Sequence, residues 1–111
     1  MNVDGITLRE ICEETEVSRR AIQGYEQAGL VSASSRNERG HLLYDDKSLE
    51  RIRQIKLFQE FGFSVKEIKE IIDAPKEILR VQLEMKIGEL KEKGEHIEVL
   101  IGKANELIAS L

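Results

Sequence analysis

The N-terminal part of the chain holds two short segments whose apolar residues recur at helical spacing, with a few polar residues between them. The first segment opens at Thr7, and Glu10 completes a capping box, in which each residue satisfies a free backbone N–H of the other. One face of this predicted helix carries Leu8, Ile11, Cys12 and Thr15. Ser18 is a natural N-cap for the second segment. Two short helices joined by so few residues are the layout of a helix-turn-helix.

The second predicted helix has an apolar inner face and a polar outer face. Ile22 points inward and is flanked by Tyr25 and Glu26. The opposite face carries Arg20, Gln23, Gly24 and Gln27. An arginine and two amides on a short helix are side chains that read base edges or bind phosphates. An ordinary solvated face is the alternative, and this helix alone does not decide between the two.

A hairpin is predicted after the second helix. Gly29 suits the C-terminal end of that helix, the polar stretch Ser32–Gly40 is predicted to be a turn, and His41–Tyr44 a returning strand. Arg36 and Arg39 at the hairpin tip are placed to touch a phosphate backbone. Exposed loop arginines without a role are the alternative explanation.

Two further helices follow. Asp45 or Asp46 caps the third, which ends at Gly62, and Ser64 opens the fourth. The buried side of the third helix is predicted to carry Leu49, Ile52, Ile55, Phe58 and Phe61. The fourth is predicted to bury Val65, Ile68, Ile71 and Ile72. Pro75 sits where a new helix starts, at a position that needs no N–H.

From Lys76 onward the apolar residues alternate in steps of four and three. This heptad seam consists of Leu83, Ile87, Leu90, Gly94, Ile97, Ile101, Ala104, Ile108 and Leu111. A helix of this length reaches roughly 50 Å, too long for a small domain to cover its apolar stripe. We therefore expect residues 1–74 to form one domain and residues 75–111 a helix that pairs with a second copy. Folding back onto its own domain is the alternative.

Charge is distributed unevenly along the chain. The 111 residues carry a formal net charge of −4, which is unusual for a protein that binds nucleic acid. Within residues 18–44, however, four arginines stand against two glutamates. Overall charge therefore argues mildly against a nucleic-acid partner, and local charge argues mildly for one.

Several functional classes are not supported by the sequence. Cys12 is the only cysteine, which permits no internal disulfide, and we interpret it as a small core residue rather than a redox or metal-binding one. No metal or other cofactor is expected. No apolar run approaches the roughly 20 residues of a membrane span, and no signal peptide is visible, so we expect a cytoplasmic protein without a membrane partner. The pairs Glu13–Glu14 and Asp45–Asp46 are better explained by a solvated face and a helix cap than by catalysis, so no enzyme is expected.

Taken together, these residues resemble the MerR family of bacterial transcription regulators. The resemblance is carried by Thr7-Leu8-Arg9-Glu10-Ile11, Val17-Ser18, Tyr25-Glu26 with Gly29-Leu30, Gly40 to Tyr44, and Gly62-Phe63-Ser64 with Glu67-Ile68. It implies a mainly α fold, in which a winged helix-turn-helix domain is followed by a long helix that forms an antiparallel coiled-coil dimer. Family members bind pseudo-palindromic promoter operators and distort the spacer so that RNA polymerase can use the promoter, a form of indirect readout.

The resemblance also implies which residues contact double-stranded DNA. Together with the face and hairpin arguments, it selects Ser18, Arg19, Arg20, Gln23, Tyr25, Arg36, Arg39 and His41. In the antiparallel homodimer, Gly94 is expected near the two-fold axis, because it lies on the seam close to the middle of the helix. The sequence identifies neither an effector nor the operator sequence.

The chain departs from the family pattern at three places. Gln23-Gly24-Tyr25 stands where the family usually has Arg-Tyr-Tyr, and Gly40-His41-Leu42 where it usually has Gly-Tyr-Arg. Glu16 replaces a glycine in the turn between the first two helices, at a cost of about 1 kcal/mol if its backbone is left-handed. Fewer cationic contacts favour a second hypothesis, a dimeric protein-interaction module whose DNA surface is weakened or lost.

Overall fold

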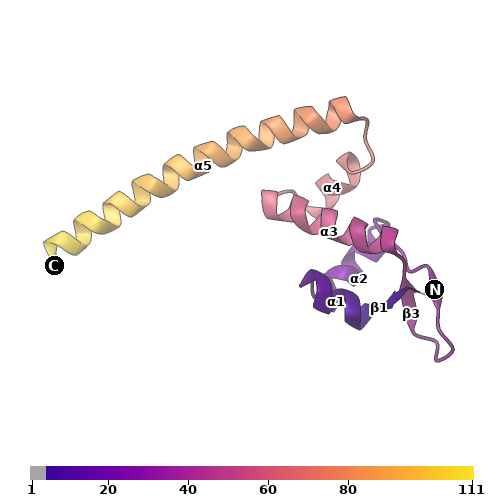
Figure 1. Cartoon of the computed structure of the whole chain (residues 1–111). Coiled ribbons are helices and arrows are strands. Elements are labelled where there is room, and N and C mark those ends of the chain that lie inside the picture. The colour runs from indigo at the N-terminus through magenta and orange to yellow at the C-terminus, as the bar shows by residue number, and fades with distance from the viewer. Residues whose placement is uncertain (1–4) are drawn as a thin grey trace. The chain divides into compact units, whose positions relative to one another are not determined.

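The computed structural model describes residues 5–111, which divide into two compact units between Asp73 and Ala74. Figure 1 shows the short elements of the first unit and the single long helix of the second. The elements of the first unit are β1 (Ile6–Thr7), α1 (Leu8–Thr15), α2 (Arg19–Gln27), β2 (Ser35–Arg36), β3 (Leu42–Tyr44), α3 (Asp46–Phe61) and α4 (Val65–Ile71). The second unit is α5 (Lys76–Ser110). The predicted helices, hairpin strand and long C-terminal helix are confirmed, whereas β1 and β2 were not predicted.

Each helix of the first unit begins at a residue whose side chain accepts a backbone N–H. Thr7 and Glu10 form the predicted capping box of α1, with N–H···O distances of 3.0 and 3.2 Å. Ser18 caps α2 and Asp45, rather than Asp46, caps α3. Ser64 forms a second capping box with the glutamate three residues later. Because these caps satisfy orphan N–H groups locally, the helix starts could be predicted from the sequence.

The turn between α1 and α2 depends on a backbone conformation that side chains rarely adopt. Glu16 has φ 58° and ψ 30°, the left-handed region, and its N–H donates to the carbonyl of Cys12 at 3.0 Å. It is the only non-glycine residue with positive φ among residues 5–111. The left-handed backbone on which the predicted strain at Glu16 depends is therefore present.

A three-stranded antiparallel sheet in the order β1-β3-β2 forms the base of the wing. Tyr44 lies opposite Ile6, and Leu42 lies opposite Arg36. Two predictions need correction here: the strand begins at Leu42 rather than His41, and the predicted turn Ser32–Gly40 contains β2. The reason is that β2 consists of two exposed polar residues, so its pairing with β3 leaves no apolar periodicity in the sequence.

The core of the first unit is aliphatic with a few aromatic rings. Its buried hydrophobic residues are Ile11, Val17, Ile22, Tyr25, Leu30, Val31, Leu43, Tyr44, Ile52, Ile55, Phe58, Phe63, Ile68, Ile71 and Ile72. These include the central residues of the predicted inner faces of α1 to α4. The predicted burial was too broad at the edges, because Leu8, Cys12, Leu49, Phe61 and Val65 are not fully buried at the ends or flanks of their helices.

Two cations on α3 hold neighbouring elements in place. The Arg51 guanidinium donates to both carboxylate oxygens of Asp73 at 2.7 Å and through Nε to the carbonyl of Leu30 at 2.9 Å. The Lys56 ammonium donates to the carbonyl of Thr15 at 2.8 Å. The end of α1 and the segment after α2 are therefore both tied to α3, which fixes the base on which α2 rests.

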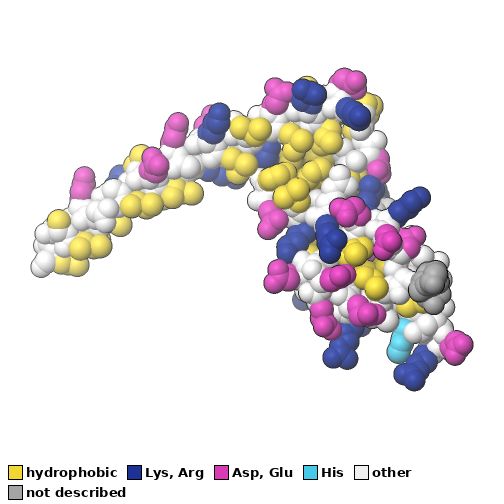
Figure 2. Space-filling model, in the orientation of Figure 1, with side chains coloured by type: hydrophobic (Ala, Val, Ile, Leu, Met, Phe, Trp, Pro, Cys, Tyr) yellow, Lys and Arg dark blue, Asp and Glu magenta, His cyan; other side chains and the backbone are white. Residues whose placement is uncertain are grey.

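The second unit is one helix without a core of its own. None of its residues is buried, and Figure 2 shows hydrophobic side chains along one side of it, with charged side chains on the other. The backbone of Pro75 precedes the first turn, as predicted. No helix within residues 5–111 is both long enough and apolar enough to cross a membrane.

Candidate nucleic-acid interface

The exposed face of α2 is the first component of the candidate interface. Ile22 is completely buried beneath it. Arg20, Gln23 and Gly24 are exposed, as predicted. Arg19 and Ser18, at the start of the helix, are exposed as well. A short helix thus presents a guanidinium and an amide to solvent from its first two turns.

Tyr25 does not lie on this exposed face. Its side chain is 2% exposed, and its hydroxyl donates to the Gln59 side-chain oxygen on α3 at 2.5 Å. Burial raises the pKa of the hydroxyl above its usual value. The structure therefore places Tyr25 as a tie between α2 and α3, whereas the sequence suggested an inward-packing ring with a DNA-facing role.

A second tyrosine ties α2 to the sheet. Tyr44 on β3 is completely buried, and its hydroxyl donates to a carboxylate oxygen of Glu26 at 3.0 Å. Burial, together with the Glu26 carboxylate, raises the pKa of Tyr44 to about 12, while the Arg19 charge lowers it slightly. The two tyrosines together set the orientation of α2 relative to both α3 and the wing.

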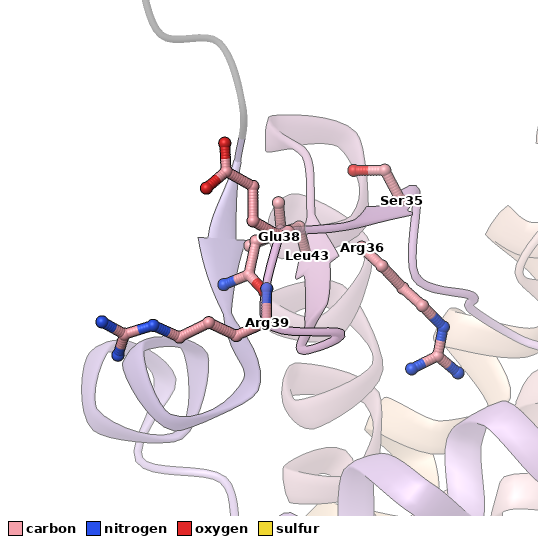
Figure 3. A pocket seen from close by; sticks show the side chains of 6 residues that line it. Ser35, Arg36, Glu38, Arg39 and Leu43 are labelled. Carbon is pink, nitrogen blue, oxygen red and sulfur yellow. The ribbon is translucent and has the colours of Figure 1, made fainter.

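The wing, residues 35–44, is the second component. Figure 3 shows the side chains of Arg36 and Arg39 leaving the hairpin in different directions, with the Glu38 carboxylate pointing elsewhere. Arg36 donates through Nη1 to the carbonyl of Gly40 at 2.6 Å. Both arginines are exposed and line a depression of about 470 Å³ at the hairpin.

Asn37 organises the wing tip and was missed in the sequence. Its side-chain oxygen accepts the backbone N–H groups of Arg39 and His41 at 2.9 and 3.0 Å. Asparagine commonly stabilises turns in this way, so an Asn within a polar stretch was the available signal. The bonds draw the backbone between β2 and β3 around the Asn37 side chain, which positions the exposed Arg39 and His41.

A groove joins the two components. We call it the basic groove; it has a volume of about 520 Å³ and is lined by Thr7, Leu8, Arg9, Arg19, Arg36, Gly40, His41 and Leu42. It brings together three of the predicted contact residues, Arg19, Arg36 and His41. It does not include Arg20 or Arg39, which lie outside its lining. Arg9, which sequence reasoning did not select, is the additional cation.

Within residues 5–111 no group of three or more His, Cys, Asp and Glu side chains is placed to hold a metal ion. Cys12 is half-buried and not in a disulfide. Arginines, amides and hydroxyls predominate among the polar residues of the interface, beside His41 and Glu38, and these groups suit an anionic ligand.

Comparison with known proteins gives the family. Residues 6–75 match the model described as "MerR HTH family regulatory protein", and residues 49–109 match the one described as "MerR, DNA binding". The chain belongs to the MerR family. Members of this family are regulatory proteins, so the family, rather than any missing site, argues against an enzyme.

Curated MerR-family relatives cover most of the chain. It is 33% identical over 98 residues to the nodulation protein NolA of Bradyrhizobium elkanii, which covers 88% of this chain and 41% of that protein. It is 30% identical over 104 residues to the transcriptional activator mta of Bacillus subtilis, covering 94% of this chain and 40% of that protein. The chain thus spans about two fifths of the length of these relatives.

Solved structures of MerR regulators share the fold. The N-terminal part of the B. subtilis multidrug transporter activator, MtaN, superposes with a TM-score of 0.73 at 29% identity, covering 93% of this chain and 97% of that one. A MerR-family regulator from Bacillus cereus gives 0.78 at 29% identity, covering 91% and 78%. HiNmlR, a MerR-family regulator solved bound to promoter DNA, gives 0.71 at 21% identity, covering 96% and 89%, which shows a shared fold.

Proposed function

We propose that this chain is a DNA-binding transcription regulator of MerR type that binds a double-stranded operator through α2 and the wing. The observation that carries the proposal is the continuous, exposed, arginine-bearing surface that runs from α2 through the basic groove to the wing. Membership of a family of regulators, and the DNA-bound state of one structural neighbour, support it. An α-helix fits the major groove, and flanking arginines fit the backbone beside it.

The residues divide into three roles under this proposal. Arg20 and Gln23, exposed on α2, contact base edges. Arg19, Arg36 and Arg39 contact phosphates, with Ser18 and His41 adding polar contacts at the ends of the surface. Tyr25 positions α2 from beneath, because its ring is buried and its hydroxyl is bound to Gln59.

The test is an electrophoretic mobility shift on a duplex that contains the protein's own promoter region. We expect Arg20→Ala and Arg39→Ala each to weaken binding by about 1–3 kcal/mol. Arg53→Ala is the matched control, since Arg53 is exposed on α3 and does not line the basic groove. If neither Arg20→Ala nor Arg39→Ala differs from this control, the assigned contact surface is wrong.

The same proposal includes an antiparallel homodimer formed by α5. Its apolar seam is exposed in a single copy: Ile87, Leu90, Ile97, Ile101 and Ile108 are 40–66% exposed. An antiparallel pair places the middle of the helix against the middle of its partner, so Gly94 lies near the two-fold axis with Leu90 and Ile97 packing across it. An added Cβ at Gly94 meets nothing within 4 Å in one chain, so the absence of a side chain there is not required by the chain's own packing.

Gly94→Leu tests this arrangement. Close approach of two backbones at Gly94 predicts a weakened or rearranged dimer in sedimentation equilibrium, because a Leu side chain has no room between them. An equal or tighter dimer shows instead that Gly94 is only a flexible point in the helix. A parallel pair, or a monomer at micromolar concentration, excludes the arrangement itself.

The proposal extends to a finer mechanism. A dimer bound to two half-sites bends and untwists the spacer between them and so adapts the promoter to RNA polymerase. Deformation of the spacer is a form of recognition without base contacts. The bend is measured by gel mobility of DNA fragments of equal length in which the operator stands at different positions. Transcription in vitro with purified polymerase measures the effect of the bend. Equal mobility of all permuted fragments argues against distortion.

Charge favours one alternative function. The formal net charge of −4 and the pI near 5.3 suit a dimeric protein-interaction module whose DNA surface is weakened. The two functions separate in the same shift experiment at low salt, where backbone contacts are strongest. Failure to shift either the promoter duplex or a mixed-sequence duplex there supports the interaction module.

A further inference from the structure

We propose that the basic groove binds a phosphate of the DNA backbone and that Arg9 of α1 is one of its ligands. This inference rests on the proposed function and deepens it by adding α1 to the interface. It assigns a site to the groove as a whole, whose cations come from three separate elements: Arg9 from α1, Arg19 from α2, and Arg36 from the wing.

The lining of the groove has the chemistry of an anion site. Among the described residues, three arginines and His41 line it, and no Asp or Glu does. This is notable in a chain where Asp and Glu outnumber Lys and Arg by 21 to 17. Three arginines that line one groove repel one another, and a phosphate bound in the groove relieves that repulsion while accepting their N–H donors.

Arg9 is held only weakly by its own helix. Its Nε lies 3.3 Å from a Glu13 carboxylate oxygen, and the two side chains are 84% and 70% exposed. Solvent screens such a pair strongly, so it contributes little to folding. A phosphate entering the groove therefore competes with a weak partner for Arg9, and the long side chain is able to turn toward it.

The positions of Arg9 and Arg19 also increase the positive field at the groove. Both arginines stand in the first turn of their helices, at the positive end of the helix dipole. A cation there opposes the helix dipole. In α1 the acidic Glu10 of the same turn offsets this cost, whereas α2 has no acidic residue in its first turn. Arg19 is therefore explained by a ligand better than by helix stability.

Arg36 is already placed for the same ligand. Its Nη1 donates to the carbonyl of Gly40 at 2.6 Å, which anchors the guanidinium at the rim of the groove. A guanidinium has five N–H donors, so its remaining N–H groups are available for a phosphate. The groove thus combines one anchored guanidinium with two exposed ones from α1 and α2.

The test compares Arg9→Gln with Arg53→Gln, which removes the same charge from an exposed position outside the groove. Binding to a mixed-sequence duplex and to the promoter duplex is measured by fluorescence anisotropy across a salt series. We expect Arg9→Gln to weaken binding to both duplexes by about two- to tenfold for each subunit. The slope of log K against log salt should become shallower by about 0.9 for each phosphate that the variant no longer neutralises. Arg53→Gln should change neither quantity to the same extent.

A substitution at Glu13 provides a second test of the role of Arg9. Glu13→Gln frees Arg9 from its ion pair, so it should tighten duplex binding, and the gain should disappear when Arg9→Gln is also present. A gain that is the same with and without Arg9 reports only the change in net charge, and it overturns the role of Arg9. Melting temperatures of Arg9→Gln and the wild type should agree within about 2 °C, since the exposed ion pair and the helix dipole oppose each other.

The outcomes separate the two proposals. If the wild type binds no duplex at low salt, the proposed function fails. If the wild type binds and Arg9→Gln matches Arg53→Gln in affinity and salt slope, the groove assignment alone fails. Inorganic phosphate, titrated at constant ionic strength, distinguishes the source of the ligand. A tight site for free phosphate that Arg9→Gln abolishes, with duplex binding unchanged, overturns the backbone assignment.

Discussion

The two units of this chain handle their apolar residues in opposite ways. In the first unit, apolar side chains from all four helices and from β3 meet in one buried core. In α5 none is buried, and the exposed large hydrophobic residues of the described chain lie on this helix, except for Leu57 and the terminal Leu111. The first unit therefore has a core of its own, whereas α5 taken by itself has an apolar surface and no core.

This difference shows where each unit obtains its stability. The first unit has local caps, a sheet and ties from α3, all within one chain. α5 contains Gly88, Gly94 and Gly102, each of which costs about 1 kcal/mol relative to Ala within a helix. Helices gain most of their stability from packing an apolar face, so we expect α5 to depend on a second copy and hence on protein concentration.

The largest effect is expected on the α5 seam. Ile97 and Val99 are equally exposed in one copy, at 54% and 53%, but they lie on opposite sides of the helix. Ile97→Asp buries a charge in the proposed dimer and should weaken association by about 3 kcal/mol or more. Val99→Asp should leave the dimer intact. Sedimentation equilibrium measures both, and equal effects would contradict a one-sided seam.

The next effect tests the core of the first unit. Ile22 is completely buried on the inner face of α2. Ile22→Ala should lower the free energy of unfolding by about 2–5 kcal/mol, because it leaves a cavity in packed surroundings. Ile78→Ala on α5 is the control, since Ile78 is 50% exposed and off the seam. Urea denaturation followed by circular dichroism should show an Ile22→Ala loss that does not depend on protein concentration.

A smaller gain is expected at the turn of the helix-turn-helix. The left-handed backbone of Glu16 is strained, whereas glycine adopts that conformation without the strain. After allowing for the greater flexibility of glycine in the unfolded chain, Glu16→Gly should raise the free energy of unfolding by about 0.5–1 kcal/mol. Thermal denaturation measures it. A destabilised Glu16→Gly would show that the Glu16 side chain contributes more than its backbone costs.

The smallest effect concerns Asp73, whose side chain is 75% exposed. Hydrogen bonds from Arg51 hold the pKa of this carboxyl below its usual value. A carboxyl with a lowered pKa in the folded state contributes stability above its unfolded pKa of about 4 and loses it as the pH falls through the folded value. The stability difference between wild type and Asp73→Asn should therefore be present at pH 7 and shrink toward pH 3. A pH-independent difference would rule out the charge as its cause.

The sequence by itself determined the local elements of this protein. The capping box at Thr7, the helix starts at Ser18 and Ser64 and the glycine after α3 depend on residues close in the chain, so their spacing was sufficient to predict them. The apolar periodicity likewise predicted the inner faces of α1 to α4 and the apolar stripe of α5. The family resemblance, carried by short strings, was confirmed by the comparisons.

Only the tertiary structure decided which distant residues meet. Three contacts join residues that are not neighbours in the chain: the pairing of β1 and β2 with β3, the hydrogen bond between Tyr25 and Gln59, and the two hydrogen bonds from Arg51 to Asp73. The basic groove is the clearest case, because Arg9 looked like an ordinary exposed helix residue until the fold brought it beside Arg19 and Arg36. Local spacing determines which face of a helix a side chain occupies. Which other element that face meets depends on packing and long-range hydrogen bonds, which leave no periodic pattern in the sequence.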